Sequence, residues 1–223
     1  MKLSKYCLIV VSVVMLVAST LSVSAETIND PTNDVYHITW VNNEYVAAAL
    51  TDSKPNIDIT SISEAYADGN LTLTLTVAGE IQNSSTIIYY MIYNTTTSTL
   101  MATYTNMGKM AIGYLSNTLI MGTLTVSADG KSVIATFPMT EAPTMKNFTT
   151  WAWEYPINIS ETNNQPTGYQ GEWWGDWAPD TAALYKINTT ENPPPSPTKT
   201  PGFEIVIAIA ALGIAVIALK RRK

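Results

Sequence analysis

The first group of residues suited to bind a ligand is acidic and lies early in the chain. Asp30, Asp34 and Asp58, with Asn56 and nearby backbone carbonyls, supply the hard oxygen ligands that calcium takes. Their spacing is not that of an EF-hand, and Asp-Pro and Asn-Asp pairs also form turns. We therefore expect either a calcium site built from these four residues or ordinary turn and capping chemistry.

The second group is aromatic and lies late in the chain. Trp173, Trp174 and Trp177 stand beside Glu172 and Asp176 in the segment Gly-Glu-Trp-Trp-Gly-Asp-Trp. Indole faces stack on sugar rings, and carboxylates accept hydrogen bonds from sugar hydroxyls. We interpret this segment as a surface loop that binds carbohydrate; the alternative is that the tryptophans plug one end of the fold.

A neighbouring aromatic row is assigned to the core. Trp151, Trp153 and Tyr155 alternate along one predicted strand, so their side chains share one face. In a β-sandwich, such a row more often packs inside than binds a ligand.

The sequence gives little support for a catalytic site. The single histidine, His37, has no cysteine partner, and a Ser-His-Asp triad requires a free choice among many serines. Glu172, Asp176 and Asp180 could offer two carboxylates at the separation of a glycosidase. We predict a protein that is not an enzyme, with a secreted glycoside-active enzyme as the alternative.

The elements that must position these groups are predicted to be strands. Leucine and valine alternate with threonine from 70 to 77, which is typical of a strand with one buried face. A partner strand at 57–62 and the turn Ala67-Asp68-Gly69-Asn70 complete a hairpin. A second Ala-Asp-Gly turn at 128–130 joins 119–126 to 132–137. Further strands are expected at 36–41, 86–93, 100–105, 110–115 and 149–155, with a short helix or turn at 44–50.

Strands at intervals of about ten residues favour an all-β fold, which we expect to be a single antiparallel, jelly-roll-like β-sandwich. The predicted ectodomain covers residues 26–190. Residues 26–200 carry six lysines against seventeen carboxylates, a net charge of −11, and no arginine. Such a surface repels phosphate backbones, so nucleic-acid binding is excluded.

Both ends of the chain read as targeting segments. Residues 1–25 have a basic start, an apolar middle and a Val-Ser-Ala end, which predicts a secretory signal helix cleaved after Ala25. This segment holds the only cysteine, Cys7, so the mature protein is expected to lack disulfides. Residues 191–201 form a Pro/Thr-rich linker. Residues 202–223 are an apolar helix followed by four cations, a pattern that places the preceding chain outside the cell.

Pro201, Gly202 and Phe203 stand directly before the apolar run 205–219, which is short for a bilayer span. This tail resembles the archaeal PGF-CTERM sorting signal. The resemblance implies that an archaeosortase removes the tail and that the mature protein is attached to a membrane lipid on the extracellular face of the cell membrane. An ordinary C-terminal transmembrane anchor is the alternative, and the location is the same.

Six Asn-x-Ser/Thr sequons mark candidate glycosylation sites, as expected for a surface glycoprotein. They begin at Asn70, Asn83, Asn94, Asn147, Asn158 and Asn188.

Three short motifs, at 29–35, 55–59 and 175–180, resemble archaeal surface domains related to DOMON-like and family-nine carbohydrate-binding sandwiches. The resemblance implies a binding or scaffold domain with sugars as the commonest ligands and with calcium in its loops. Some DOMON domains bind haem through methionine and histidine, which makes a haem-binding electron carrier a further alternative through His37. Our main prediction is a non-catalytic surface protein that binds carbohydrate, calcium or both, or that serves in the envelope, with glycans or other envelope proteins as partners.

Overall fold

The computed structural model describes residues 24–42, 44–49, 53–115, 118–158, 171–182 and 186–187. Most of the signal segment, all of the linker and sorting tail, and Asn188 lie outside these residues. The sorting motif Pro201, Gly202 and Phe203 therefore lies outside them too. The described part of the chain holds no helix with the length and apolarity of a membrane span.

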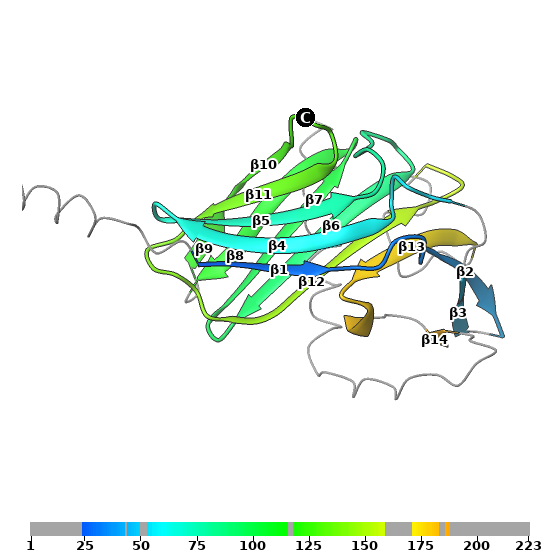
Figure 1. Ribbon diagram of the computed structural model, residues 1–223, viewed down its shortest axis with the longest axis horizontal. Coiled ribbons are helices and arrows are strands. Elements are labelled where there is room, and N and C mark those ends of the chain that lie inside the picture. The colour runs from blue at the N-terminus through cyan, green and yellow to red at the C-terminus, as the bar shows by residue number, and fades with distance from the viewer. Residues whose placement is uncertain are drawn as a thin grey trace, which may run out of the picture.

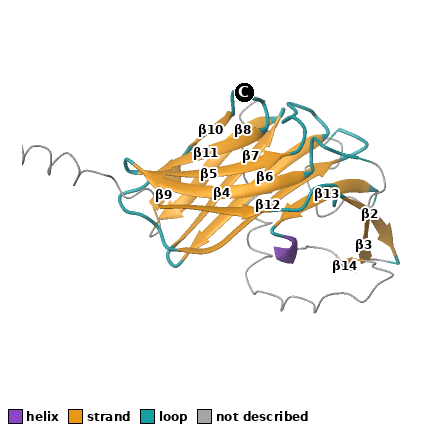
Figure 2. Ribbon diagram, viewed as in Figure 1, coloured by secondary structure: helices purple, strands orange, loops and turns teal. Residues whose placement is uncertain are grey.

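The fold is all-β and has two sheets (Figures 1 and 2). The five-stranded sheet has the order β1-β4-β5-β11-β10 and is antiparallel throughout. Its strands are β1 (Ser24–Asn29), β4 (Ile59–Ala67), β5 (Asn70–Val77), β11 (Ser132–Pro138) and β10 (Thr123–Val126). The first strand includes the last two residues of the predicted signal peptide, so cleavage after Ala25 would leave Glu26 within β1.

The nine-stranded sheet has the order β14-β3-β2-β13-β12-β6-β7-β8-β9. It is antiparallel except where β14 pairs parallel with β3. Its strands, in chain order, are β2 (Tyr36–Val41), β3 (Glu44–Ala49), β6 (Ile87–Thr95), β7 (Ser98–Thr105), β8 (Gly108–Leu115), β9 (Thr118–Met121), β12 (Met145–Glu154), β13 (Trp173–Ala178) and β14 (Lys186–Ile187). The only described helix is the 3-10 turn η2 (Asp180–Ala182).

Apolar side chains from the facing sides of the two sheets form the main core. On β5, the leucines and Val77 are buried while the intervening threonines are only partly covered, as the alternation predicts. Strands β6 and β12 contribute Tyr89, Tyr93 and Phe148 from the opposite sheet. The two-sheet, β-sandwich part of the prediction is therefore confirmed, and its jelly-roll topology stays a prediction.

The first predicted hairpin is confirmed with its turn. Asp68 and Gly69 both have positive φ, 51° and 72°. Two successive left-handed residues are what a tight two-residue hairpin turn requires. In the second hairpin, only Gly130 has positive φ, and the Ser127 N–H donates to the Ser132 carbonyl across a longer loop. The two Ala-Asp-Gly turns therefore differ in conformation.

Three local predictions were wrong. The segment at 44–50 forms strand β3 rather than a helix or turn, because it pairs along its whole length with β2. The continuous strand expected at 119–126 is divided at Gly122, where the chain passes from one sheet to the other. A Cβ at Gly122 would lie 2.6 Å from the Thr136 carbonyl oxygen, so only glycine fits this crossing. The tryptophan segment forms strand β13 rather than a loop.

Candidate metal centre

Five aspartates from four segments meet at one end of the sandwich. Asp30 and Asp34 lie in the link from β1 to β2, Asp58 directly precedes β4, Asp176 lies in β13 and Asp180 begins η2. All five come from the first or the last third of the chain. The link, β4 and β13 lie side by side here (Figure 1). We call these five residues the aspartate cluster.

Backbone hydrogen bonds fix the buried members of the cluster. The Ile59 N–H donates to Asp176 Oδ2 at 2.6 Å, which joins β13 to the start of β4. The Trp177 N–H donates to Asp176 Oδ1 at 2.8 Å. The Asn33 N–H donates to Asp58 Oδ2 at 2.9 Å. Asn33 itself is in the left-handed conformation, with a φ of 66°. Each of these carboxylate oxygens keeps a second lone pair for another ligand.

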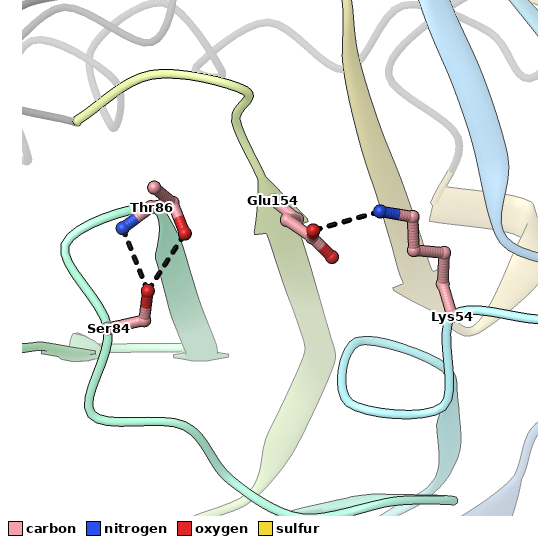
Figure 3. Close-up of polar contacts among 4 residues, drawn as sticks. All are labelled: Lys54, Ser84, Thr86 and Glu154. Carbon is pink, nitrogen blue, oxygen red and sulfur yellow. Dashed lines mark hydrogen bonds and ion pairs between the residues drawn. The ribbon is translucent and has the colours of Figure 1, made fainter.

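The loop that carries Asp58 is held against the nine-stranded sheet by Lys54. Its ammonium contacts Glu154 Oε1 at 2.8 Å, at the end of β12 (Figure 3). The same ammonium lies 4.1 Å from the ring centroid of Trp174. On the other side of the loop, the Gly79 N–H donates to the Pro55 carbonyl at 2.6 Å. These contacts place Asp58 opposite β13.

Several cluster oxygens have no hydrogen-bond partner within the described residues. They are Asp30 Oδ2, Asp58 Oδ1 and both carboxylate oxygens of Asp34. Asp30 is 8% exposed and Asp58 is 2% exposed, so water reaches these groups poorly. A buried charge without a partner is costly, and proteins normally pair it or bind a metal to it. Neither of the two ion pairs described in the structure includes a member of the cluster.

The carboxyl groups also raise one another's pKa. Burial, and then repulsion from Asp180 and the other carboxyls, raises the pKa of Asp30 to about 8. Burial, and then repulsion from Asp34, raises the pKa of Asp176 to about 9. The pKa of Asp34 rises to about 6 for the same reasons, and burial raises that of Asp58. The site therefore holds negative charge poorly unless a cation neutralises it.

The cluster offers two sets of metal ligands. One oxygen from each of Asp30, Asp34 and Asp180 lies within 4.8 Å of the others, and the same holds for Asp34, Asp58 and Asp176. Oxygens bound to one calcium ion at about 2.3–2.6 Å are at most about 5 Å apart. The buried aspartates can therefore hold a metal ion.

The sequence analysis grouped three of these five residues, Asp30, Asp34 and Asp58, and the structure brings these three together. Asn56 lies in the same loop as Asp58, and its side-chain oxygen accepts the Glu80 N–H at 3.1 Å; its place among the ligands stays a prediction. The sequence places Asp176 in the predicted sugar site, and Asp180 enters only the alternative of a glycoside-active enzyme. Only the pairing of β13 with β2 and β12 shows that they face the early aspartates.

The predicted sugar-binding tryptophans are mostly core residues. Trp173 and Trp177 are 0% exposed and alternate with Trp174 and Asp176 along β13, so they leave no ring face for a sugar. They join a second apolar cluster with Trp151, Trp153 and Tyr155, which confirms the burial expected for that row. This cluster lies on the face of the nine-stranded sheet opposite the main core.

Trp174 is only partly buried, but its ring is already engaged. The His37 imidazole stacks on it with centroids 5.3 Å apart, in addition to the Lys54 contact. The carboxylate oxygen Oε2 of the exposed Glu172 lies 3.0 Å from His37 Nε2, at hydrogen-bond distance. The prediction of carbohydrate binding therefore rests on Trp174 and Glu172 alone.

Four of the five described sequon asparagines are exposed. Asn94 is half-buried and accepts a hydrogen bond from the Thr99 hydroxyl at 2.9 Å. The exposed ones are Asn70, Asn83, Asn147 and Asn158.

Comparison with known proteins identifies one feature. Residues 200–223 match the family described as the PGF-CTERM motif. No curated protein and no solved structure matches the chain. The motif implies processing by an archaeosortase and a lipid anchor. The chain is thus a cell-surface protein of the archaeal type, anchored through its C-terminus on the extracellular face of the membrane.

Proposed function

We propose that this surface protein is a non-catalytic β-sandwich whose structure is locked by calcium in the aspartate cluster. The observation that carries the proposal is the buried, unpartnered oxygen of Asp58 among carboxylates that no described cation neutralises. Calcium is preferred over magnesium because the ligands are carboxylates from loops and strand ends. Calcium accepts six to eight oxygens in flexible geometry, whereas magnesium needs a near-ideal octahedron and keeps several waters.

The position of the cluster gives the bound ion a structural role. Its ligands join the β1–β2 link and the start of β4 to β13 and η2, so one ion would connect the two sheets at this end. In an envelope protein, this connection would keep the domain folded at the cell surface. The acidic composition of the ectodomain also favours attraction of cations.

The test is the melting temperature of the purified chain in detergent, followed by tryptophan fluorescence with chelator, calcium or magnesium. A ligand at a hundred times its dissociation constant stabilises the native state by about 2.7 kcal/mol. For a domain of this size that is a rise of about 5–11 °C. The same melting temperature in chelator and in millimolar calcium would refute the proposal. A larger rise with magnesium than with calcium would refute the choice of ion.

Glycosylation belongs to the same proposal, supported by the exposure of four sequon asparagines. Glycopeptide mass spectrometry of protein from the native cell should find modified Asn70, Asn83, Asn147 or Asn158. Unmodified peptides at all four would remove this part of the proposal.

A further inference from the structure

The aspartate cluster divides into two ligand groups with one member in common. The first group is Asp30, Asp34 and Asp180, and the second is Asp34, Asp58 and Asp176. In each group, the three oxygens fit within 4.8 Å, which is the size of one calcium coordination sphere. Only Asp34 belongs to both groups.

Asp34 is suited to bridge two ions. Apart from its own backbone and the Asp180 carboxyl, which belongs to the first group, neither of its carboxylate oxygens has a hydrogen-bond partner among the described residues, so both are available as ligands. Each group also contains its own buried carboxylate with an unpartnered oxygen, Asp30 in the first and Asp58 in the second. The unsatisfied oxygens are therefore distributed over both groups rather than gathered around one point.

Charge also favours two ions. When all five aspartates are ionised they carry five negative charges, and one divalent cation would leave three of these charges uncompensated in a largely buried site. Two divalent cations leave one, and that one is placed most easily on Asp180, which is exposed. Uncompensated buried charge costs several kcal/mol per ion even after relaxation of the protein.

We propose that the cluster binds two calcium ions bridged by the Asp34 carboxylate. This inference rests on the proposed function and specifies its stoichiometry. Asp58 and Asp176 complete the inner site, where both are buried, and Asp30 and Asp180 complete the outer site, which opens to solvent through Asp180. The outer ion exchanges with solvent, while the inner ion stays with the fold.

The experiment counts calcium ions per chain by equilibrium dialysis and atomic emission on the full chain in detergent. The wild type should bind two ions. Asp180→Asn should bind one, because it alters an exposed ligand of the outer site only. Asp34→Asn should bind fewer than one, because it removes the bridge. The matched control is Asp68→Asn, an exposed aspartate in the β4–β5 turn whose left-handed conformation asparagine also tolerates, and it should bind two.

The outcomes separate the two proposals. One ion per wild-type chain would overturn the bridged pair and leave the calcium-locked fold intact, whereas no bound calcium would overturn both. Two ions on Asp180→Asn would overturn the assignment of the outer site. Because Asp180 is exposed, this variant tests the inference even if Asp34→Asn fails to fold.

Discussion

Asp58→Asn should stabilise the calcium-free protein and remove most of the stabilisation by the inner calcium ion. Asp58 Oδ2 accepts the Asn33 N–H, and an asparagine oxygen can take over this bond. The new amide NH₂ then occupies the position of the unpartnered Oδ1, beside the Asp34 and Asp176 carboxyls. A donor replaces an acceptor, and one of the mutually repelling carboxyls disappears.

The expected changes in melting temperature follow from the new hydrogen bond and from the lost calcium ligand. A hydrogen bond to a charged group contributes about 1.5–3 kcal/mol, so the calcium-free variant should melt about 4–8 °C above the wild type for about 2 kcal/mol. If loss of a ligand weakens binding of the inner ion about a hundredfold, the stabilisation by that ion at a fixed calcium concentration falls from about 2.7 to about 0.4 kcal/mol. The part of the rise in melting temperature that comes from the inner ion then shrinks from about 5–11 °C to about 1–2 °C.

The assay is a four-way comparison of melting temperatures for wild type and variant, each in chelator and in calcium. Asp68→Asn again serves as the control, and calcium should stabilise it as strongly as the wild type. Two results would refute the reasoning. A lower melting temperature of Asp58→Asn in chelator would mean that Asp58 is a turn-capping residue whose charge is needed. An undiminished response to calcium would place the ion elsewhere.

Three further predictions follow from the structure and the sorting motif. In chelator, the melting temperature should fall as pH rises from 5 to 9. Folding raises the pKa of Asp30 from 3.8 to about 8 and that of Asp176 to about 9, so both lose protons that stabilise the folded state. Saturating calcium should flatten this slope, and a melting temperature that rises with pH in chelator would contradict the burial of these two carboxyls. Gly79→Ala should cost about 1–3 kcal/mol in the free energy of unfolding measured with urea, because its Cβ would lie 2.5 Å from Asn56 Oδ1 and 2.8 Å from the backbone of the same loop; an unchanged urea midpoint would show that this loop is loosely packed. Mass spectrometry of the mature protein should find a C-terminus upstream of the matched tail, and a chain that still ends at Lys223 would restore the plain transmembrane anchor.

Local patterns predicted the parts of the fold that depend on local chemistry. The alternation at 70–77 specifies β5 because one buried face and one wet face are visible in the sequence itself. The turn at Asp68 and Gly69 is readable because few residues adopt left-handed conformations. Strand β3 was missed because Ala47, Ala48 and Ala49 favour a helix in isolation, and only pairing with β2 makes them a strand.

For the same reason, the sequence predicted the early aspartates of the candidate site but not the late ones. Asp30, Asp34 and Asp58 lie close in sequence, in loops whose composition signals turns or ligands. Asp176 and Asp180 follow more than a hundred residues later, and their approach depends on how β13 pairs. The same strand explains the error over the tryptophans. In a loop, Trp173 and Trp177 could be displayed, but alternation along β13 places both in the second apolar cluster.

The surface anchor gives the β13–η2 end of the fold a mechanical meaning. A pulling force on the C-terminal anchor would enter the described domain through β14 and then through η2 and β13. Strand β14 is paired over only two residues, so it offers little resistance to pulling. Among the described residues of this path, Asp176 at the aspartate cluster joins β13 to the five-stranded sheet through the hydrogen bond that its carboxylate accepts from the Ile59 N–H. The aspartate cluster therefore lies where a pulling force would pass from one sheet to the other, and a bound ion would strengthen this connection.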